Sequence, residues 1–289
     1  MIDIGNSWDA FERVKESINN MRALSVLPDG AEVTFNSCGF ARPISIVPLS
    51  IMGLSKNLSF SDIPGYLGTI GFPSGQEVEY YTDNNGTYLP LTRADLTNLD
   101  YEGKEQKLRS LSDIYISLLE RNIITDKQFL QRIGKDVSAL LITEMIDNIF
   151  EHSEASTSII FSQYWPGNDS CEICLADNGI GMYESLLNAG RNVESEIDAM
   201  QKVIEEFLSA KDEFGSTKRG TGIRNAINLL SNNELNGYFC VISGTAGYYV
   251  DSQGRKTFLN LQNLDWNGTI VNMGFTKPAQ KLDIYEYIR

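Results

Sequence analysis

Two glycines stand directly before an amphipathic stretch in the second half of the chain. The segment "KRGTGIRNAINLL" places Gly220 and Gly222 ahead of Ile223, Ile227 and Leu230, whose spacing predicts a helix. A glycine-rich turn at a helix N-terminus presents free backbone amides together with the positive end of the helix dipole. The pattern therefore predicts a site for phosphate.

A carboxylate and two more glycines follow a predicted buried strand. In "ICLADNGIGM" an apolar run leads directly into Asp177, and Gly179 and Gly181 come next. Glycines at this spacing permit positive φ angles and close backbone approach, as a loop moulded around a ligand requires. A later segment, "DWNGTIVNMGF", places Gly268 and Thr269 at the start of another strand.

An acid and an amide lie four residues apart in a predicted helix. Residues 136–152 place Ile142, Ile146 and Ile149 on one side, where they face a core. Glu144 and Asn148, in "EMIDN", lie one turn apart on the opposite side. Such a pair most often belongs to a solvated polar face, and its spacing alone does not separate that case from a functional site.

In this order and spacing the four segments resemble the motifs of the GHKL superfamily, which includes DNA gyrase, the large heat-shock chaperones, histidine kinases and the mismatch-repair protein MutL. "EMIDN" resembles the N box, "DNGIG" the first glycine box, "RGTGI" the second, and "GTIVNM" the final motif. The resemblance covers residues 130–277. It implies an α/β fold, a two-layer sandwich of the Bergerat type, that binds ATP and Mg²⁺.

The resemblance implies a role for each motif residue. Asn148 would hold Mg²⁺ through its side-chain oxygen, because this cation prefers hard oxygen ligands. Glu144 would be the general base that polarises the water or hydroxyl attacking the γ-phosphate. The remaining residues would bind the nucleotide: Asp177 at the adenine amino group with Thr269 in support, Gly179 and Gly181 beside the base, and Gly220, Thr221 and Gly222 over the phosphates.

Residues 182–219, between the two glycine boxes, would form the ATP lid. The stretch "VESEIDAMQKVIEEFLSA" is amphipathic, and the polar segment "KDEFGSTKRG" follows it. Lys218 and Arg219 are the best local bases for phosphate charge, and a solvated lid edge is an almost equal alternative. Lids of this kind order around a ligand and can gate turnover.

The first hundred residues predict a small α/β domain. A helix over 8–24, a strand at 31–37, a helix from Pro43 and a strand at 76–83 form a βαβ-like pattern. The pattern resembles STAS-like domains found beside regulatory ATPases, and a scaffold or recognition role without chemistry is favoured. Residues 101–135 are predicted to be a helical connector, and residues 136–289 the ATP-binding domain.

Composition limits the classes of function. The chain has 289 residues and a net charge of -14, which argues against broad binding to nucleic acid or to anionic membranes. No stretch approaches the roughly 20 apolar residues that span a bilayer. The first residues do not resemble a signal peptide, so we expect a cytoplasmic protein. Cys171 and Cys174 are expected on opposite faces of a strand rather than at a metal.

Three functions are compatible with these motifs. The first is a regulatory protein that binds Mg-ATP and hydrolyses it slowly to change its contacts with a protein partner or with a second copy of itself. The second is a protein serine/threonine kinase of the anti-sigma-factor type. Asn148 followed by His152 in the predicted helix resembles the pattern of those kinases. The third is a non-catalytic nucleotide sensor or interaction module, because a fold does not by itself imply turnover.

Overall fold

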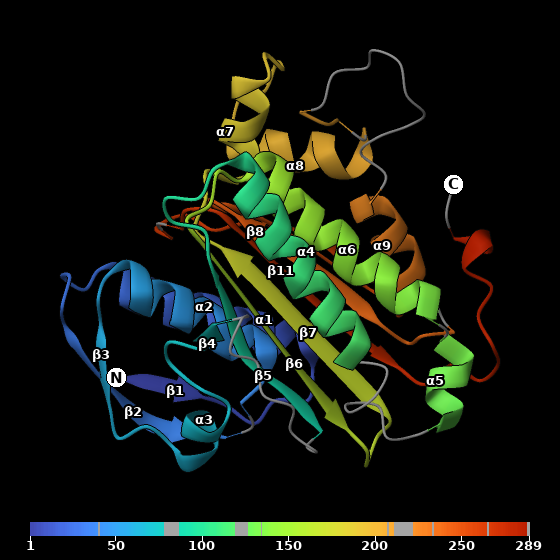
Figure 1. The fold of residues 1–289 in the computed structure, drawn as a ribbon, viewed down its shortest axis with the longest axis horizontal. Helices are drawn as coiled ribbons and strands as arrows, with labels where there is room; N and C mark the ends of the chain where they lie inside the picture. The colour runs from blue at the N-terminus through green and yellow to red at the C-terminus, as the bar shows by residue number, and fades with distance from the viewer. Residues whose placement is uncertain are drawn as a thin grey trace.

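The computed structural model of the chain contains two β-sheets with helices packed around them (Figure 1). It describes residues 1–39, 41–77, 87–118, 127–133, 135–206, 208–210, 222–232, 234–264 and 266–287. The fold is mixed α/β, as the sequence predicts. Within the described ranges, no helix combines the length and the apolar character that crossing a membrane requires.

The described part of the larger sheet has eight strands in the order β10–β9–β8–β11–β7–β6–β5–β4. Neighbouring strands are antiparallel, except for β4 and β5, which are parallel. The central strands β6, β7, β11 and β8 are almost entirely buried. The strands are β4 (Gln76–Glu77), β5 (Tyr88–Asp95), β6 (Thr157–Trp165), β7 (Ser170–Asp177), β8 (Tyr238–Ser243), β9 (Ala246–Asp251), β10 (Lys256–Asn260) and β11 (Thr269–Thr276).

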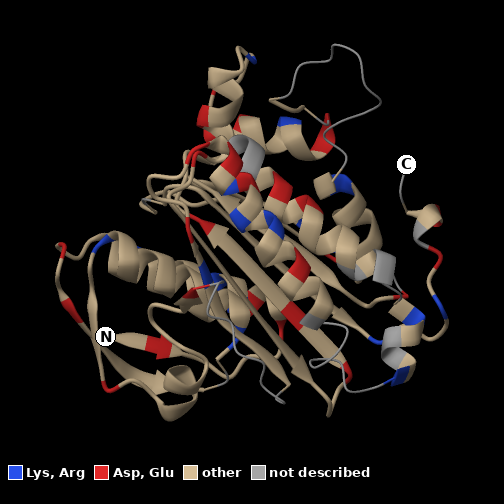
Figure 2. Ribbon diagram, viewed as in Figure 1, with Lys and Arg blue, Asp and Glu red and all other residues tan. Residues whose placement is uncertain are grey.

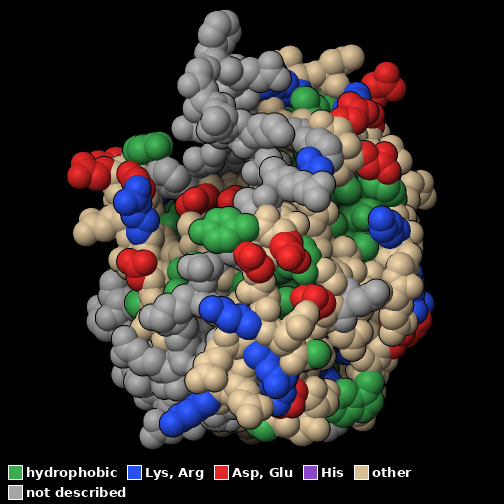
Figure 3. Space-filling view, turned by 90° about the vertical axis from the view of Figure 1, so that its right-hand side faces the viewer, with side chains coloured by type: hydrophobic (Ala, Val, Ile, Leu, Met, Phe, Trp, Pro, Cys, Tyr) green, Lys and Arg blue, Asp and Glu red, His purple; other side chains and the backbone are tan. Residues whose placement is uncertain are grey.

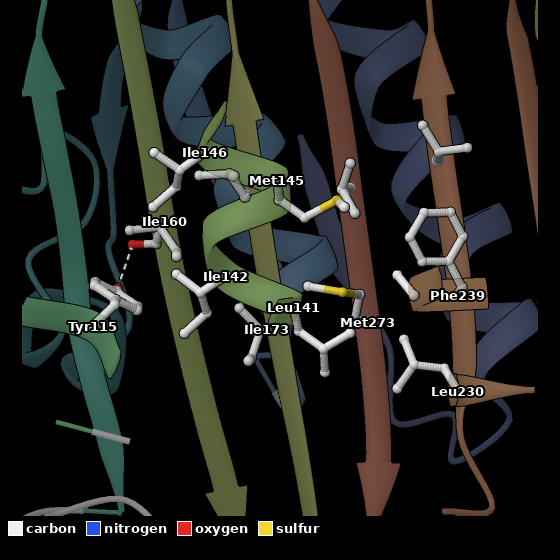
Figure 4. Close-up of a cluster of buried hydrophobic side chains, with 14 of the residues drawn as sticks. Tyr115, Leu141, Ile142, Met145, Ile146, Ile160, Ile173, Leu230, Phe239 and Met273 are labelled. Carbon is white, nitrogen blue, oxygen red and sulfur yellow. Dashed lines mark hydrogen bonds between the residues drawn. The ribbon is translucent and has the colours of Figure 1, made fainter. Parts of the chain in front are cut away.

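Three helices cover one face of this sheet (Figure 1): α4 (Tyr101–Leu118), α6 (Lys135–His152) and α9 (Gly222–Leu230). The helix predicted over residues 136–152 is confirmed, and its Ile142, Ile146 and Ile149 are buried as expected. Figure 4 shows the α6 side chains lying over the strands. The hydroxyl of Tyr115, from α4, donates a hydrogen bond of 2.8 Å to the carbonyl oxygen of Ile160 and so fixes α4 to the sheet.

The smaller sheet consists of β1 (Ile2–Ile4), β2 (Glu32–Cys38) and β3 (Ser59–Ser61), which run parallel. Helix α1 (Ala10–Ser25) joins β1 to β2, and α2 (Pro43–Ser55) joins β2 to β3. The elements predicted at 8–24, at 31–37 and from Pro43 are therefore confirmed. Strand β4 covers the start of the strand predicted at 76–83, and residues 78–86 lie outside the described ranges.

Helices α1 and α2 pack against the second face of the larger sheet. Ile46 and Met52 of α2 belong to the same buried cluster as Ile159 and Phe161 of β6. The expected two-layer sandwich is thus extended by a third layer of helices. The physical reason is that the central strands are apolar on both faces, and each face must be covered to exclude water.

The C-x-x-C segment illustrates the two buried faces. Cys171 belongs to the apolar cluster under α4, α6 and α9, whereas Cys174 belongs to the cluster under α1 and α2. Both thiols are free, and burial raises the pKa of each. The prediction that these two cysteines lie on opposite faces of a strand is confirmed.

The division between the two sheets falls earlier in the chain than the boundary predicted at residue 100. Strand β5 lies before that residue, yet it pairs with β6 in the larger sheet. This pairing depends on contacts between residues 62 to 75 positions apart, from Asp95 with Thr157 to Tyr88 with Gln163, which residue patterns alone do not reveal. The assignment of residues 1–100, 101–135 and 136–289 to separate domains stays a prediction.

Two helices within the predicted lid pack on each other at one end of the larger sheet (Figure 1): α7 (Gly181–Asn188) and α8 (Glu196–Glu205). Leu186, Val193 and Ala199 form a small buried cluster between them. The backbone N–H of Thr245 donates a hydrogen bond of 2.7 Å to the carboxylate of Glu196, which ties α8 to the β8–β9 turn. The first part of the lid segment is therefore folded against the sheet.

Charged residues lie mainly on the outward sides of the helices, while the strands of the larger sheet are mostly uncharged (Figure 2). On the face drawn in Figure 3, acidic and basic side chains lie among hydrophobic ones. The remaining elements are α3 (Gly65–Thr69), α5 (Lys127–Ile133) and a short 3-10 helix (Ile284–Glu286).

Candidate functional site

A cavity lies where α6, α7 and α9 meet the ends of β7 and β11. Its volume is about 160 Å³, many times the roughly 10–15 Å³ that one water molecule needs. It can therefore admit part of an organic ligand. Six of the residues predicted from the sequence line it: Glu144, Asn148, Asp177, Gly181, Gly222 and Thr269.

Asp177 is the last residue of β7, and only 1% of its surface is exposed. Its Oδ1 accepts a hydrogen bond of 2.8 Å from the backbone N–H of Gly179, and its Oδ2 accepts one of 3.2 Å from the backbone N–H of Thr269. A carboxylate has about four lone-pair positions, so Asp177 can accept a further hydrogen bond from a ligand.

Burial raises the pKa of Asp177 from 3.8 to about 7. The two backbone hydrogen bonds lower the pKa, but their effect is smaller than that of burial. The cause of the rise is the loss of water around the charged form. A buried carboxylate with such a shifted pKa at a cavity is a frequent feature of functional sites.

The loop after Asp177 is held by close backbone contacts. A Cβ atom on Gly179 would overlap the carbonyl oxygen of Ser153, so only glycine fits. The next residue, Ile180, donates its backbone N–H to the same oxygen at 2.7 Å. The side-chain oxygen of Asn178 accepts a hydrogen bond of 2.8 Å from the backbone N–H of Thr157. The loop is thus tied to the end of α6 and to the start of β6.

Ser243 is a site residue that the sequence motifs did not indicate. Its hydroxyl accepts a hydrogen bond of 2.8 Å from the backbone N–H of Met182 and donates one of 3.2 Å to the carbonyl oxygen of Gly268. It therefore joins the start of α7 to the residue before Thr269. The only local signal was the turn segment "SGTAG" after an apolar strand, and such turns are common.

Glu144 lies against the N-terminal end of α9. A Cβ atom on Gly222, the first residue of α9, would overlap the carboxylate of Glu144. A larger residue here would therefore have to displace the Glu144 side chain. The positive end of the α9 dipole favours a negative group at this position, whether a carboxylate or a phosphate.

Asn148 lines the cavity one turn after Glu144, and Asp147, which the sequence reasoning did not select, lines it as well. Among the described residues, no group of three His, Cys, Asp or Glu side chains is placed to hold a metal ion. A cation at Asn148 would therefore need further oxygen ligands from a bound molecule and from water. Mg²⁺ commonly binds in this way, through one or two protein groups together with phosphates.

The remaining wall of the cavity is largely apolar. Its side chains come from α6, β7, α7 and β11, and they include Met145, Ile149, Leu175, Leu186 and Val271. An apolar pocket with a few polar groups at its end is typical of sites for small planar ligands.

Four predicted site residues lie outside the described ranges: Lys218, Arg219, Gly220 and Thr221. Their placement at the phosphates stays a prediction. The side chain of His152 is likewise outside the described part of the structure.

Comparison with protein-family models finds no family that matches the chain, and comparison with curated proteins finds no significantly similar sequence.

Proposed function

We propose that the cavity binds Mg-ATP and that the protein hydrolyses it slowly to change its conformation and its contacts with a partner. One observation carries the proposal. Residues from five separate elements or loops, which the motif resemblance assigns to a single nucleotide, line the same cavity. Unrelated polar residues scattered over 126 positions of sequence, from Glu144 to Thr269, would not be expected to meet in one cavity.

The adenine end of the proposed site is at Asp177. A buried carboxylate with spare acceptor capacity suits the exocyclic amino group of adenine, which is a donor. The apolar wall around it suits the flat faces of a purine ring. A buried carboxylate acceptor beside an apolar wall thus fits an adenine nucleotide.

The acidic lining of the cavity is the reason for a metal in the proposed site. The ionisable residues that line the cavity within the described ranges are Glu144, Asp147 and Asp177, all acids. Phosphate groups entering alone would be repelled by these carboxylates. Mg²⁺ at Asn148 would offset that repulsion, because the cation neutralises phosphate charge when bound.

In this proposal Glu144, whose carboxylate lies against the first residue of α9, would act as the general base on a water molecule. In the proposed step, water oxygen forms a bond to the γ-phosphorus while the bond to the β–γ bridging oxygen breaks. The water proton passes to the Glu144 carboxylate, and ADP leaves with the electron pair. A general base of this kind contributes about 10²–10⁴ in rate.

The test separates binding from turnover by comparing two variants, Asn148→Ala and Glu144→Ala. Asn148→Ala should lose Mg²⁺-dependent nucleotide affinity, because a cation held by Asn148 would already offset phosphate charge in the ground state. Glu144→Ala should keep affinity and lose about 10²–10⁴ in single-turnover rate, because a general base acts mainly in the transition state. The measurements are calorimetric titration with Mg-ATP and single-turnover release of labelled phosphate.

Two variants in α7 serve as matched controls. Asn188→Ala and Glu184→Ala remove the same side-chain types from exposed positions that do not line the cavity. Both should bind and hydrolyse like the original protein. If Glu144→Ala binds ATP poorly while the bound fraction turns over normally, Glu144 is a binding or structural residue. If the unaltered protein releases no phosphate, the hydrolysis half of the proposal fails and only binding remains.

A further inference from the structure

A second cavity, of about 230 Å³, lies on the opposite face of the larger sheet. It is bounded by α1, by the start of α2, and by the ends of β6 to β9 and β11 that are remote from the first cavity. Two arginines and a glutamate that line it are almost completely buried: Arg13, Arg42 and Glu172.

The two arginines differ in their contact with the one buried glutamate. Arg13 Nη2 lies 3.1 Å from Glu172 Oε2 and 3.3 Å from the hydroxyl of Tyr238. Arg42 Nη1 lies 3.9 Å from the same carboxylate oxygen, at the outer limit of an ion pair. One carboxylate thus faces two guanidinium groups, and Arg42 has only the longer contact. A buried charge with a poorly placed partner is unfavourable.

Polar atoms in this cluster also lack hydrogen-bond partners in the described structure. These atoms are Nε of Arg13, Nε of Arg42, Oε1 of Glu172 and the side-chain oxygen of Asn272. Buried polar atoms are nearly always hydrogen-bonded, so a cluster of them calls for a bound water, ion or ligand. Arg13, Arg42 and Glu172 line the cavity, which has room for such a group.

Two further acids line the cavity, and they share one cation. The Asp9 side chain accepts hydrogen bonds from the first turn of α1 and pairs with Arg255 at 3.3 Å. Asp251 accepts hydrogen bonds from Tyr249 and from the backbone N–H of Arg255, and it pairs with the Arg255 side chain at 3.8 Å. The cluster is therefore balanced in total charge, and what Arg42 lacks is an acidic group within close hydrogen-bond distance.

Arg42 is not needed as a helix cap or as the main tie between the sheet and α1. It is the N-cap residue of α2, where its side chain makes no capping hydrogen bond and its positive charge faces the positive end of the helix dipole. The ion pair between Arg13 and Glu172 already links α1 to β7. The guanidinium of Arg42 lies between two rings, 3.8 Å from the centroid of Trp165 and 4.8 Å from that of Trp8.

We propose that this second cavity binds the oxyanion group, a carboxylate or a phosphate, of a small ligand, with Arg42 as its principal contact. Guanidinium groups present planar pairs of N–H donors that match carboxylate and phosphate oxygens. The anion would give Arg42 the close acceptor that Glu172 does not provide, and the two indole rings hold Arg42 in a fixed orientation. The ligand would be recognised between the larger sheet and α1. This cavity shares no lining residue with the first one, so the inference does not depend on the nucleotide proposal.

The test uses the full chain and follows tryptophan fluorescence, because Trp8 and Trp165 flank Arg42. Inorganic phosphate and acetate are titrated separately at constant ionic strength, with chloride as the reference anion. At least one of them should give a saturable change that chloride does not give. Arg42→Gln should weaken the response about ten- to a hundredfold, the range expected when a charged hydrogen-bond partner is lost. Which of the two anions saturates identifies the ligand group.

Three further variants make the outcome decisive. Lys15→Gln removes a positive charge from an exposed position of α1 that does not line the cavity, and it should respond like the original protein. Asn148→Ala should also keep the response, because it alters the first cavity only. Arg42→Lys preserves the charge but not the paired N–H donors. If Arg42→Gln does not fold, Arg42→Lys replaces it in the titration, and its fluorescence response to the anion should be weaker than that of the original protein.

The proposal is overturned if neither anion gives a saturable change, or if Arg42→Gln and Arg42→Lys respond like the original protein. It is also overturned if the response disappears in Asn148→Ala, because the anion would then be in the first cavity. Failure of nucleotide binding leaves this result unaffected.

Discussion

Replacement of Asp177 by asparagine separates the energetic cost of burying a carboxylate from its use in binding. In the folded protein the pKa of Asp177 is about 7, compared with 3.8 for an exposed aspartate. At about 1.36 kcal/mol for each pKa unit, ionised Asp177 lowers the free energy of unfolding by about 4 kcal/mol relative to the protonated form. Asparagine has nearly the same shape and does not ionise.

The sign of the pH dependence follows from proton binding. Because its pKa is higher in the folded state, the folded protein holds more protons than the unfolded chain between pH 3.8 and about 7. The stabilising contribution is fully present below pH 3.8 and is lost as the pH rises through about 7. Relative to Asp177→Asn, the original protein should therefore lose roughly 3 kcal/mol between about pH 5 and about pH 8.

The assay is urea unfolding of both proteins at about pH 5 and about pH 8, with the difference in unfolding free energy compared between the two conditions. Any hydrogen bond that asparagine makes less well contributes at both pH values and therefore cancels. Asp113→Asn, at an exposed position in α4, is the control and should differ from the original protein by less than about 0.5 kcal/mol. If the difference in unfolding free energy between Asp177→Asn and the original protein does not change with pH, burial does not raise the pKa of Asp177 as stated.

The same variant should lose affinity for ATP and ADP by about ten- to a hundredfold, the value of a charge-assisted hydrogen bond to the adenine amino group. If the variant is more stable than the original protein above neutral pH and yet binds nucleotide less well, the loss of affinity is local to the site. A misfolded variant would lose both stability and affinity. Calorimetry that gives unchanged ADP affinity would remove Asp177 from the proposed site.

The other expected outcomes concern close contacts and buried polar groups. Gly222→Ala should destabilise the protein by about 1–3 kcal/mol in thermal or urea unfolding, because the added methyl group overlaps Glu144, and an unchanged stability would contradict that packing. Ser243→Ala should cost about 1–3 kcal/mol in the same measurement and should weaken nucleotide binding, because backbone groups at the starts of α7 and β11 lose their partner. Glu172→Gln should cost about 3–5 kcal/mol, because it leaves Arg13 buried without a counterion, and added phosphate should restore part of that stability. A loss below about 1 kcal/mol for Glu172→Gln would show that water already compensates the buried arginines.

Patterns that depend on neighbouring residues were predictable from the sequence. The spacing of Ile142, Ile146 and Ile149 predicted α6 and its buried side, because helical geometry repeats every 3.6 residues. The alternation of a strand predicted that Cys171 and Cys174 lie on opposite faces. The order of the motifs predicted which residues would meet, and six of the described ones line one cavity, whereas Gly179 does not.

Contacts between distant segments were decided only by the tertiary structure. The pairing of β5 with β6, the covering of the second face of the sheet by α1 and α2, and the bridging hydroxyl of Ser243 all join residues that are far apart in sequence. Such contacts leave no local periodicity, because each depends on packing and hydrogen bonds that exist only once the sheets have formed. The shifted pKa of Asp177 and the long contact between Arg42 and Glu172 have the same origin, since burial and the distance to a counterion are properties of the folded chain.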